Sequence, residues 1–223
     1  VDMPTALVNA NGTLFFRAAG TGTNTQRTLW KSDGTPEGTV QVVDRDGWTF
    51  YSDLVNVNGT VFFEAHDQNG YELWKSDGTA AGTVLIKDIA PGDKNAEPEN
   101  FTVGDGLLYF TANDHEHDTP HALDQRREIW QTDGTEAGTI KLTDIYSTPQ
   151  RVDPFEYDPF PKQLTYNNGQ LLFTTDDGQH GRELWVLRVA PDLLLTYDAH
   201  VADQTLVDSP GDVDADGYDD IFL

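Results

Sequence analysis

One short segment returns along this chain, and it limits the possible folds more than any other feature. It reads Leu29-Trp30-Lys31-Ser32-Asp33-Gly34-Thr35 at its first appearance, and close versions stand at residues 73–79 and 129–135. A Gly-Thr pair follows each version after a short spacer. A fourth version, Glu183-Leu184-Trp185-Val186, keeps the tryptophan and loses the Asp-Gly-Thr turn. Self-similarity of this kind predicts one supersecondary unit that is used several times.

A second repeated motif, Asn-Gly or Asp-Gly, precedes each tryptophan. It occurs as Asn11-Gly12, Asn58-Gly59, Asp105-Gly106 and Asn168-Gly169, always between runs of β-forming residues. The pair is a strong hairpin signal because a type I′ turn needs positive φ at both central residues. Each unit therefore predicts four strands, which in the second copy are residues 54–57, 60–65, 72–75 and 84–88.

These strands predict an all-β fold, a β-propeller of four-stranded antiparallel blades, since four short strands in every ~40–50 residues are typical of a blade. We expect four recognisable repeats and a partial fifth. The repeats lie at about 6–44, 53–89, 100–145 and 163–198, inside a propeller domain of residues 1–198. Residues 199–223 are expected to form a partial calcium-binding segment that could begin a further blade.

The acidic composition narrows the class of partner. The chain has 38 acidic and 14 basic residues, for a formal net charge of -24. Such a surface repels nucleic acid and anionic lipid heads, and it attracts cations or a basic partner. No apolar run approaches the ~20 residues of a membrane span. We therefore expect no nucleic acid partner and no insertion into a membrane.

Two further features bear on the compartment. Cysteine is absent, which excludes disulfides and cysteine metal sites. No signal peptide is visible, and the sequence stops on Ile221-Phe222-Leu223 in the middle of an expected strand. We therefore expect the chain to be cut from a longer one.

The repeated segments resemble a bacterial repeat family named for its consensus, Glu-Leu-Trp-x-x-Asp-Gly-Thr. The resemblance covers about residues 6–189. It implies a large exported or surface protein and no known reaction. The first copy departs at Thr28, where the other copies have Glu, and the fourth has Leu187-Arg188-Val189 where the turn should be. We expect the repeated tryptophans to pack between neighbouring blades.

Loop lengths indicate that the two faces of the propeller differ. The Asn-Gly and Asp-Gly-Thr turns are uniform and share one face, whereas the connections on the opposite face vary in length. Varying loops on one face usually mark a binding face. We call it the variable face, and its leading candidate ligand contacts are Trp48, Tyr51, Tyr157 and Phe160. The alternative is that these aromatic side chains fold back and cap the core.

A candidate calcium loop stands near the end of the sequence. Its expected ligands are the carboxylates of Asp212, Asp214, Asp216 and Asp220 and the carbonyl of Tyr218. Carboxylates at alternate positions followed by a glycine can wrap one hard cation with oxygen atoms. The loop resembles the calcium loop of the FG-GAP repeats in integrin-type propellers. The alternative is a solvated acidic turn.

A weaker metal candidate combines His115, His117 and His121. Imidazoles that lie close together suit zinc or copper. The alternative is a polar insertion without a metal, since the spacing matches no recognised metal motif.

Together these features predict a calcium-dependent module, secreted or at the cell surface of a bacterium, that binds or adheres to an extracellular glycan or protein. No nucleophile elbow, phosphate loop or cysteine nucleophile is present, so we expect no enzyme. Two alternatives stay open. One is a structural surface repeat without a discrete ligand, and the other is a polysaccharide hydrolase or lyase that uses carboxylates of the variable face.

Overall fold

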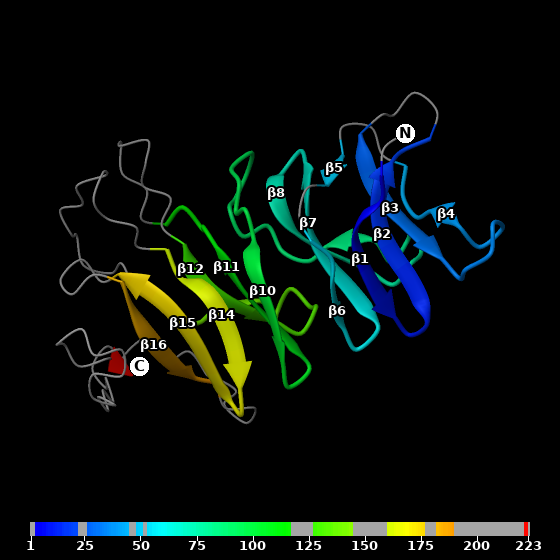
Figure 1. Cartoon of the computed structure of the whole chain (residues 1–223). Helices are drawn as coiled ribbons and strands as arrows, with labels where there is room; N and C mark the ends of the chain where they lie inside the picture. The colour runs from blue at the N-terminus through cyan, green and yellow to red at the C-terminus, as the bar shows by residue number, and fades with distance from the viewer. Residues whose placement is uncertain are drawn as a thin grey trace.

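The computed structural model describes residues 3–21, 26–44, 48–50, 53–116, 127–144, 160–176 and 182–189, with the backbone of 221–222. In these ranges the regular elements are β-strands, and they form four sheets (Figure 1). The predicted all-β fold is confirmed. Within the described part of the chain, no helix has the length and apolarity that crossing a bilayer requires.

Each sheet is one blade. Blade 1 contains β1 (Thr5–Ala10), β2 (Thr13–Ala19), β3 (Arg27–Ser32) and β4 (Val40–Gln41). Blade 2 contains β5 (Thr49–Phe50), β6 (Val55–Val57), β7 (Thr60–Asp67), β8 (Gly70–Ser76) and β9 (Val84–Leu85), with β5 and β6 both paired to β7. Blade 3 contains β10 (Glu99–Gly104), β11 (Leu107–Ala112), β12 (Glu128–Thr132) and β13 (Ile140–Lys141). Blade 4 contains β14 (Lys162–Asn167), β15 (Gln170–Asp176), β16 (Arg182–Arg188) and β17 (Ile221–Phe222), which lies parallel to β16.

The Asn-Gly pairs form the tight hairpins that the sequence predicts. In blade 2, Asn58 has a φ of 52° and Gly59 a φ of 90°, so both central residues lie in the left-handed region. The Asn56 side chain closes the turn by accepting a hydrogen bond from the Gly59 N–H at 2.8 Å. These turns set the register between the first and second strands that they join.

The Asp-Gly-Thr turns close through a repeated set of hydrogen bonds. In blade 2, Asp77 Oδ1 accepts bonds from the Thr79 N–H at 2.8 Å and from its hydroxyl at 2.7 Å. The Thr79 hydroxyl oxygen accepts a bond from the Gly82 N–H at 2.9 Å. Gly82 is required because a Cβ there would lie 2.1 Å from Asp77 Oδ1. The spacing between the two Gly-Thr pairs is therefore a consequence of how the turn folds.

The tryptophans occupy one register position in every blade. Each faces a phenylalanine of the second strand, in the pairs Phe16–Trp30, Phe63–Trp74, Phe110–Trp130 and Phe173–Trp185. The later three indoles are 2%, 6% and 7% exposed, whereas Trp30 is half-buried. The expected packing between blades is confirmed for those three positions.

The hydrophobic core lies between blades, which stand side by side in chain order with blades 1 and 4 at opposite ends (Figure 1). At each boundary the Leu or Ile before one tryptophan packs toward the next blade's tryptophan. Leu29 shares a cluster with Trp74, Leu73 with Trp130, and Ile129 with Trp185. One side of a blade therefore completes the core of the next.

In blade 2 the glutamate two residues before the tryptophan anchors the connection to the next blade. Glu72 is fully buried, and its carboxylate accepts hydrogen bonds from the N–H groups of Ile89 at 3.1 Å and Ala90 at 2.9 Å. In blade 1 the position is Thr28, whose hydroxyl donates to the Val43 carbonyl oxygen at 2.8 Å. Thr28 thus makes a hydrogen bond to the equivalent connection, between blades 1 and 2, with a shorter side chain. This anchor fixes the start of the segment that borders the site below.

Candidate functional site

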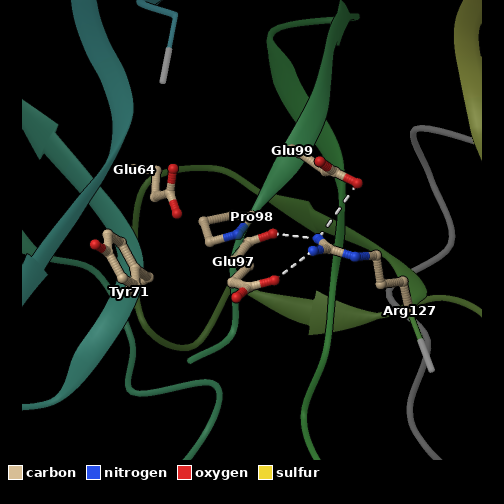
Figure 2. A pocket seen from close by; sticks show the side chains of 6 residues that line it. All are labelled: Glu64, Tyr71, Glu97, Pro98, Glu99 and Arg127. Atoms are coloured by element: carbon tan, nitrogen blue, oxygen red, sulfur yellow. Dashed lines mark hydrogen bonds and ion pairs between the residues drawn. The ribbon is translucent and has the colours of Figure 1, made fainter. Parts of the chain in front are cut away.

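A cavity of about 360 Å³ lies where blades 2 and 3 meet (Figure 2). Six residues line it: Glu64, Tyr71, Glu97, Pro98, Glu99 and Arg127. They come from β7, β8, the connection between the two blades, the start of β10, and the residue before β12. Four of the six lie in segments that the sequence assigns to connections of the variable face, whereas Glu64 and Tyr71 lie on strands of blade 2. We call this cavity the inter-blade pocket.

Strand alternation directs Glu64 and Tyr71 into the pocket. Phe63 and Ala65 are fully buried in the core shared with blade 1, so Glu64 between them faces blade 3. Tyr71 is half-buried, and its ring lies 4.7 Å from the His66 ring, centroid to centroid. One wall of the pocket therefore offers a carboxylate and an aromatic ring.

Arg127 holds the opposite wall together. One of its guanidinium nitrogens lies 2.6 Å from Glu97 Oε2, and the other lies 3.4 Å from Glu99 Oε1 and also bonds the Glu97 carbonyl oxygen. The Arg127 side chain is 9% exposed, whereas those of Glu97 and Glu99 are 34% and 54% exposed. A buried cation thus fixes two carboxylates that solvent can reach.

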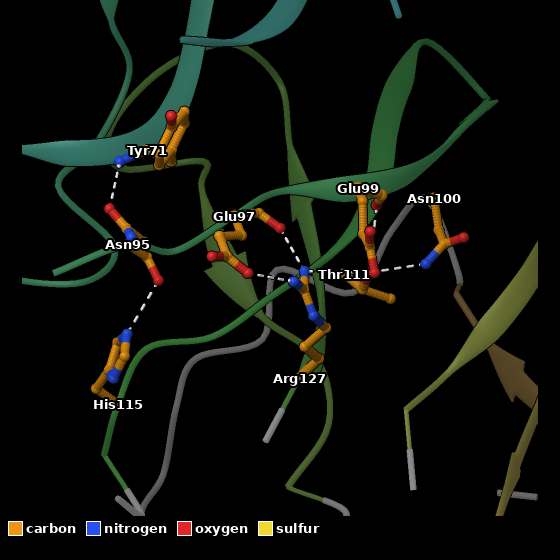
Figure 3. Close-up of polar contacts among 8 residues, drawn as sticks. All are labelled: Tyr71, Asn95, Glu97, Glu99, Asn100, Thr111, His115 and Arg127. Atoms are coloured by element: carbon orange, nitrogen blue, oxygen red, sulfur yellow. Dashed lines mark hydrogen bonds and ion pairs between the residues drawn. The ribbon is translucent and has the colours of Figure 1, made fainter. Parts of the chain in front are cut away.

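The connection carrying Glu97 is tied to the blades on both sides (Figure 3). The Tyr71 carbonyl accepts bonds from the N–H groups of Ala96 at 2.9 Å and Glu97 at 3.1 Å. Asn95 Oδ1 accepts a bond from the Tyr71 N–H at 3.1 Å, and the Asn95 carbonyl lies 2.9 Å from His115 Nε2. Glu97 itself has a φ of 47°. Backbone bonds therefore set the shape of the pocket.

Burial and neighbouring charges raise the pKa of the Glu64 carboxyl to about 7. Burial contributes most, and the Glu97 charge adds to it. The nearby Arg127 charge opposes the rise. Near neutral pH the Glu64 carboxyl is therefore partly protonated, and it lies beside two carboxylates that Arg127 pairs.

The structure separates the predicted aromatic contacts. Trp48 is 2% exposed, and its indole centroid lies 5.9 Å from that of Phe63 and 5.5 Å from that of Trp74. Trp48 therefore caps the core, as in the alternative given for these aromatic side chains, because it fits into the gap between blades 1 and 2. Phe160 is half-buried, and its carbonyl accepts a bond from Arg182 at 3.2 Å. Tyr51 and Tyr157 lie outside the described residues.

The metal candidates fall mostly outside the described ranges. All five calcium-loop residues, Asp212, Asp214, Asp216, Tyr218 and Asp220, lie there, as do His117 and His121. His115 is half-buried and bonded to Asn95. Among the described residues, no group of three or more His, Cys, Asp or Glu side chains is placed to hold a metal ion.

The pocket residues carry two signals that the repeat pattern obscures. Glu64 is a charged residue on a strand whose side chains are buried on both faces. Arg127 directly precedes the Glu-Ile-Trp motif of blade 3, and it is the last residue of the connection between β11 and β12. The sequence does not show that Glu64 and Arg127 line one pocket, because the packing of blade 3 on blade 2 brings them together.

Comparisons with known proteins identify the fold. No family model and no curated protein matches the sequence. Two puromycin hydrolase structures are similar to this one, with TM-scores of 0.53 and 0.51 at 10% and 9% identity. They match 83% and 82% of this chain, which spans 27% and 26% of theirs. A thermostable family-43 glycoside hydrolase has a TM-score of 0.37 at 10% identity, over 82% of this chain and 69% of its own. The four sheets are thus blades like those of the puromycin hydrolase propeller domain.

Proposed function

We propose that this chain is an extracellular, calcium-binding β-propeller of the Glu-Leu-Trp-x-x-Asp-Gly-Thr repeat family, and that it binds a glycan or a protein partner through its variable face. The observation that carries the proposal is the inter-blade pocket, four of whose six lining residues come from segments that the sequence assigns to connections of that face. Its walls combine carboxylates with an aromatic ring. The calcium loop at residues 212–220 belongs to the proposal on its ligand spacing alone.

The pocket chemistry favours a ligand that donates hydrogen bonds. Carboxylates accept bonds from sugar hydroxyls or from the ammonium and guanidinium groups of a protein. Tyr71 offers a ring face for a sugar or a cation. The formal net charge of -24 disfavours anionic ligands. The proposed partner is therefore a neutral glycan or a basic segment of a protein.

A binding screen tests this proposal. Soluble neutral polysaccharides and lysine- or arginine-rich peptides would be screened against the wild-type protein and the Glu64→Gln and Tyr71→Ala variants. We expect one ligand class to bind the wild type and to lose about 1–3 kcal/mol of binding free energy in each variant. Glu136→Gln is the matched control, because Glu136 is exposed on a turn of the opposite face. Absence of any binding would favour the structural-repeat alternative.

One observation favours a polysaccharide-cleaving enzyme as the second candidate. Glu64, with its pKa raised to about 7, shares a pocket with two further carboxylates, and a general acid or base works best when its pKa lies near the working pH. Release of reducing ends during the polysaccharide screen would support this candidate, and Glu64→Gln should abolish the release. Binding without cleavage would leave the binding module as the function.

A further inference from the structure

The Asp-Gly-Thr turns of blades 2 and 3 lie against the preceding blade. A Cβ at Gly78 would lie 3.0 Å from Phe15 Cζ and 3.5 Å from Lys31 Cδ. At Gly134 the corresponding distances are 3.2 Å to Phe62 Cζ and 3.8 Å to Lys75 Cδ. Two successive boundaries thus use an aromatic ring and a lysine to cover a turn.

The equivalent turn of blade 1 is open. A Cβ at Gly34 would meet no described atom within 4 Å. Gly34 is exposed and Ser32 and Thr39 are half-buried. Their equivalents in blades 2 and 3 are all buried: Gly78, Ser76 and Thr83, and Gly134, Thr132 and Thr139. Trp30 follows the same trend. Equivalent turns of one chain can thus be compared with and without a preceding blade packed against them.

The lysine contributes a specific polar contact. Lys75 Nζ donates to the Gly134 carbonyl oxygen at 2.7 Å. Lys31 lies close enough to the next turn that its charge helps lower the pKa of the Asp77 carboxyl, after the hydrogen bonds from Thr79. The pKa of the Asp33 carboxyl is lowered chiefly by its hydrogen bonds with Thr35.

In blade 3 the lysine after the tryptophan and the Asp-Gly-Thr turn of the next blade are both missing. Its residue after the tryptophan is Gln131, and the following blade has Leu187-Arg188-Val189 in place of Asp-Gly-Thr. Lysine therefore stands in the two blades whose next neighbour has the turn, and it is absent where the next turn is absent. The contact is a matched pair of features on adjacent blades.

We propose that Trp30, Ser32, Gly34 and Thr39 form a docking surface for another unit of the same repeat. We call it the acceptor surface. Its occupant presents an aromatic ring and a lysine in the arrangement of Phe62 and Lys75. The ring covers Gly34, the lysine donates to the Gly34 carbonyl oxygen, and apolar side chains cover the half-buried Trp30. The acceptor surface is equivalent to the turns that are covered at the two boundaries within this chain.

Thiol reactivity tests whether the acceptor surface is open. Because the chain has no cysteine, Ser32→Cys and Ser76→Cys each introduce a single thiol at equivalent positions. In the monomer, we expect the Ser32→Cys thiol to react with a maleimide at least about tenfold faster than the Ser76→Cys thiol, which only local opening exposes. Equal protection of the two thiols would overturn the proposal.

An extended chain tests the occupant. A second copy of residues 48–98 is placed directly before Thr5. Thr5 is the junction because it occupies in blade 1 the strand position that Glu99 occupies in blade 3. The added copy should protect the Ser32→Cys thiol at least about tenfold. As the matched control, Phe62→Ser and Lys75→Ser in the added copy alone should restore its reactivity. Lack of protection by the unaltered copy would contradict the proposal, as would concentration-dependent protection with dimers in light scattering, since the occupant would then be a second copy.

Discussion

Arg127 and Glu97 form an ion pair of 2.6 Å that joins the start of one strand to the connection between two blades. The same guanidinium bonds the Glu97 carbonyl oxygen and lies 3.4 Å from Glu99. One buried cation thus holds the backbone and two carboxylates of the inter-blade pocket. The pocket has its shape before any ligand arrives, which lowers the ordering cost of binding.

The first prediction concerns this ion pair. Arg127→Met should lower the free energy of unfolding by about 1.5–3 kcal/mol, because hydrogen bonds to charged groups are lost from a buried position. Urea denaturation monitored by tryptophan fluorescence measures the change. Arg188→Met, at an exposed strand end, should stay within about 0.5 kcal/mol of wild type. Equal effects for the two variants would show that the Arg127 contacts add nothing to stability.

The second prediction concerns pH. Burial first, and then the Glu97 charge, raise the pKa of Glu64 to about 7 in the folded state, above its ordinary value of 4.5. A raised folded pKa gives stability that is fully present below the unfolded pKa and is lost as pH rises through the folded value. Stability should therefore fall between about pH 4.5 and 7.

Glu64→Gln isolates this contribution from those of other carboxyls. Unfolding free energies at pH 5 and pH 8 should differ less in the variant than in wild type. Glu72, with a pKa raised to about 8 mainly by burial, contributes a loss of the same sign in both proteins. An unchanged pH 5 to pH 8 difference would mean that Glu64 titrates normally.

Local chemistry made much of the fold predictable. Asn58-Gly59 and its equivalents specify the hairpins between the first two strands through backbone preferences. The repeated segment around each tryptophan supplies the third strand, whose tryptophan lies opposite a phenylalanine of the second strand. The burial of Trp48 depended on the gap between two blades, which loop composition does not encode. The pocket could not be predicted from the sequence either, because Glu64 and Arg127 meet only after blade 3 packs on blade 2. Turns are local, whereas sites between blades arise from long-range packing.

The third prediction compares two equivalent tryptophans. Trp74→Ala should cost about 3–5 kcal/mol, because it empties a filled boundary between blades. Trp30→Ala should cost less by at least about 1 kcal/mol, because Trp30 is half-buried and loses less transfer free energy. Urea denaturation of both variants gives the comparison, and an equal cost would contradict the difference in packing between blades 1 and 2.

The fourth prediction concerns calcium. Removing calcium with a chelator should lower the melting temperature, because a ligand bound only by the folded state stabilises it. Asp214→Ala should abolish the difference between chelated and calcium-loaded protein. Asp93→Ala serves as control for general loss of acidic charge, since Asp93 is exposed on the connection between blades. Calorimetry that detects no calcium binding to wild type would reduce the loop to a turn.

The proposed function requires that the ligand binds in the inter-blade pocket. Hydrogen–deuterium exchange measured with and without the ligand found in the binding screen tests it most directly. We expect slower exchange in residues 64–71 and 95–99, with both effects lost in Glu64→Gln at the same ligand concentration. Protection confined to other loops, or unchanged in that variant, would contradict the claim.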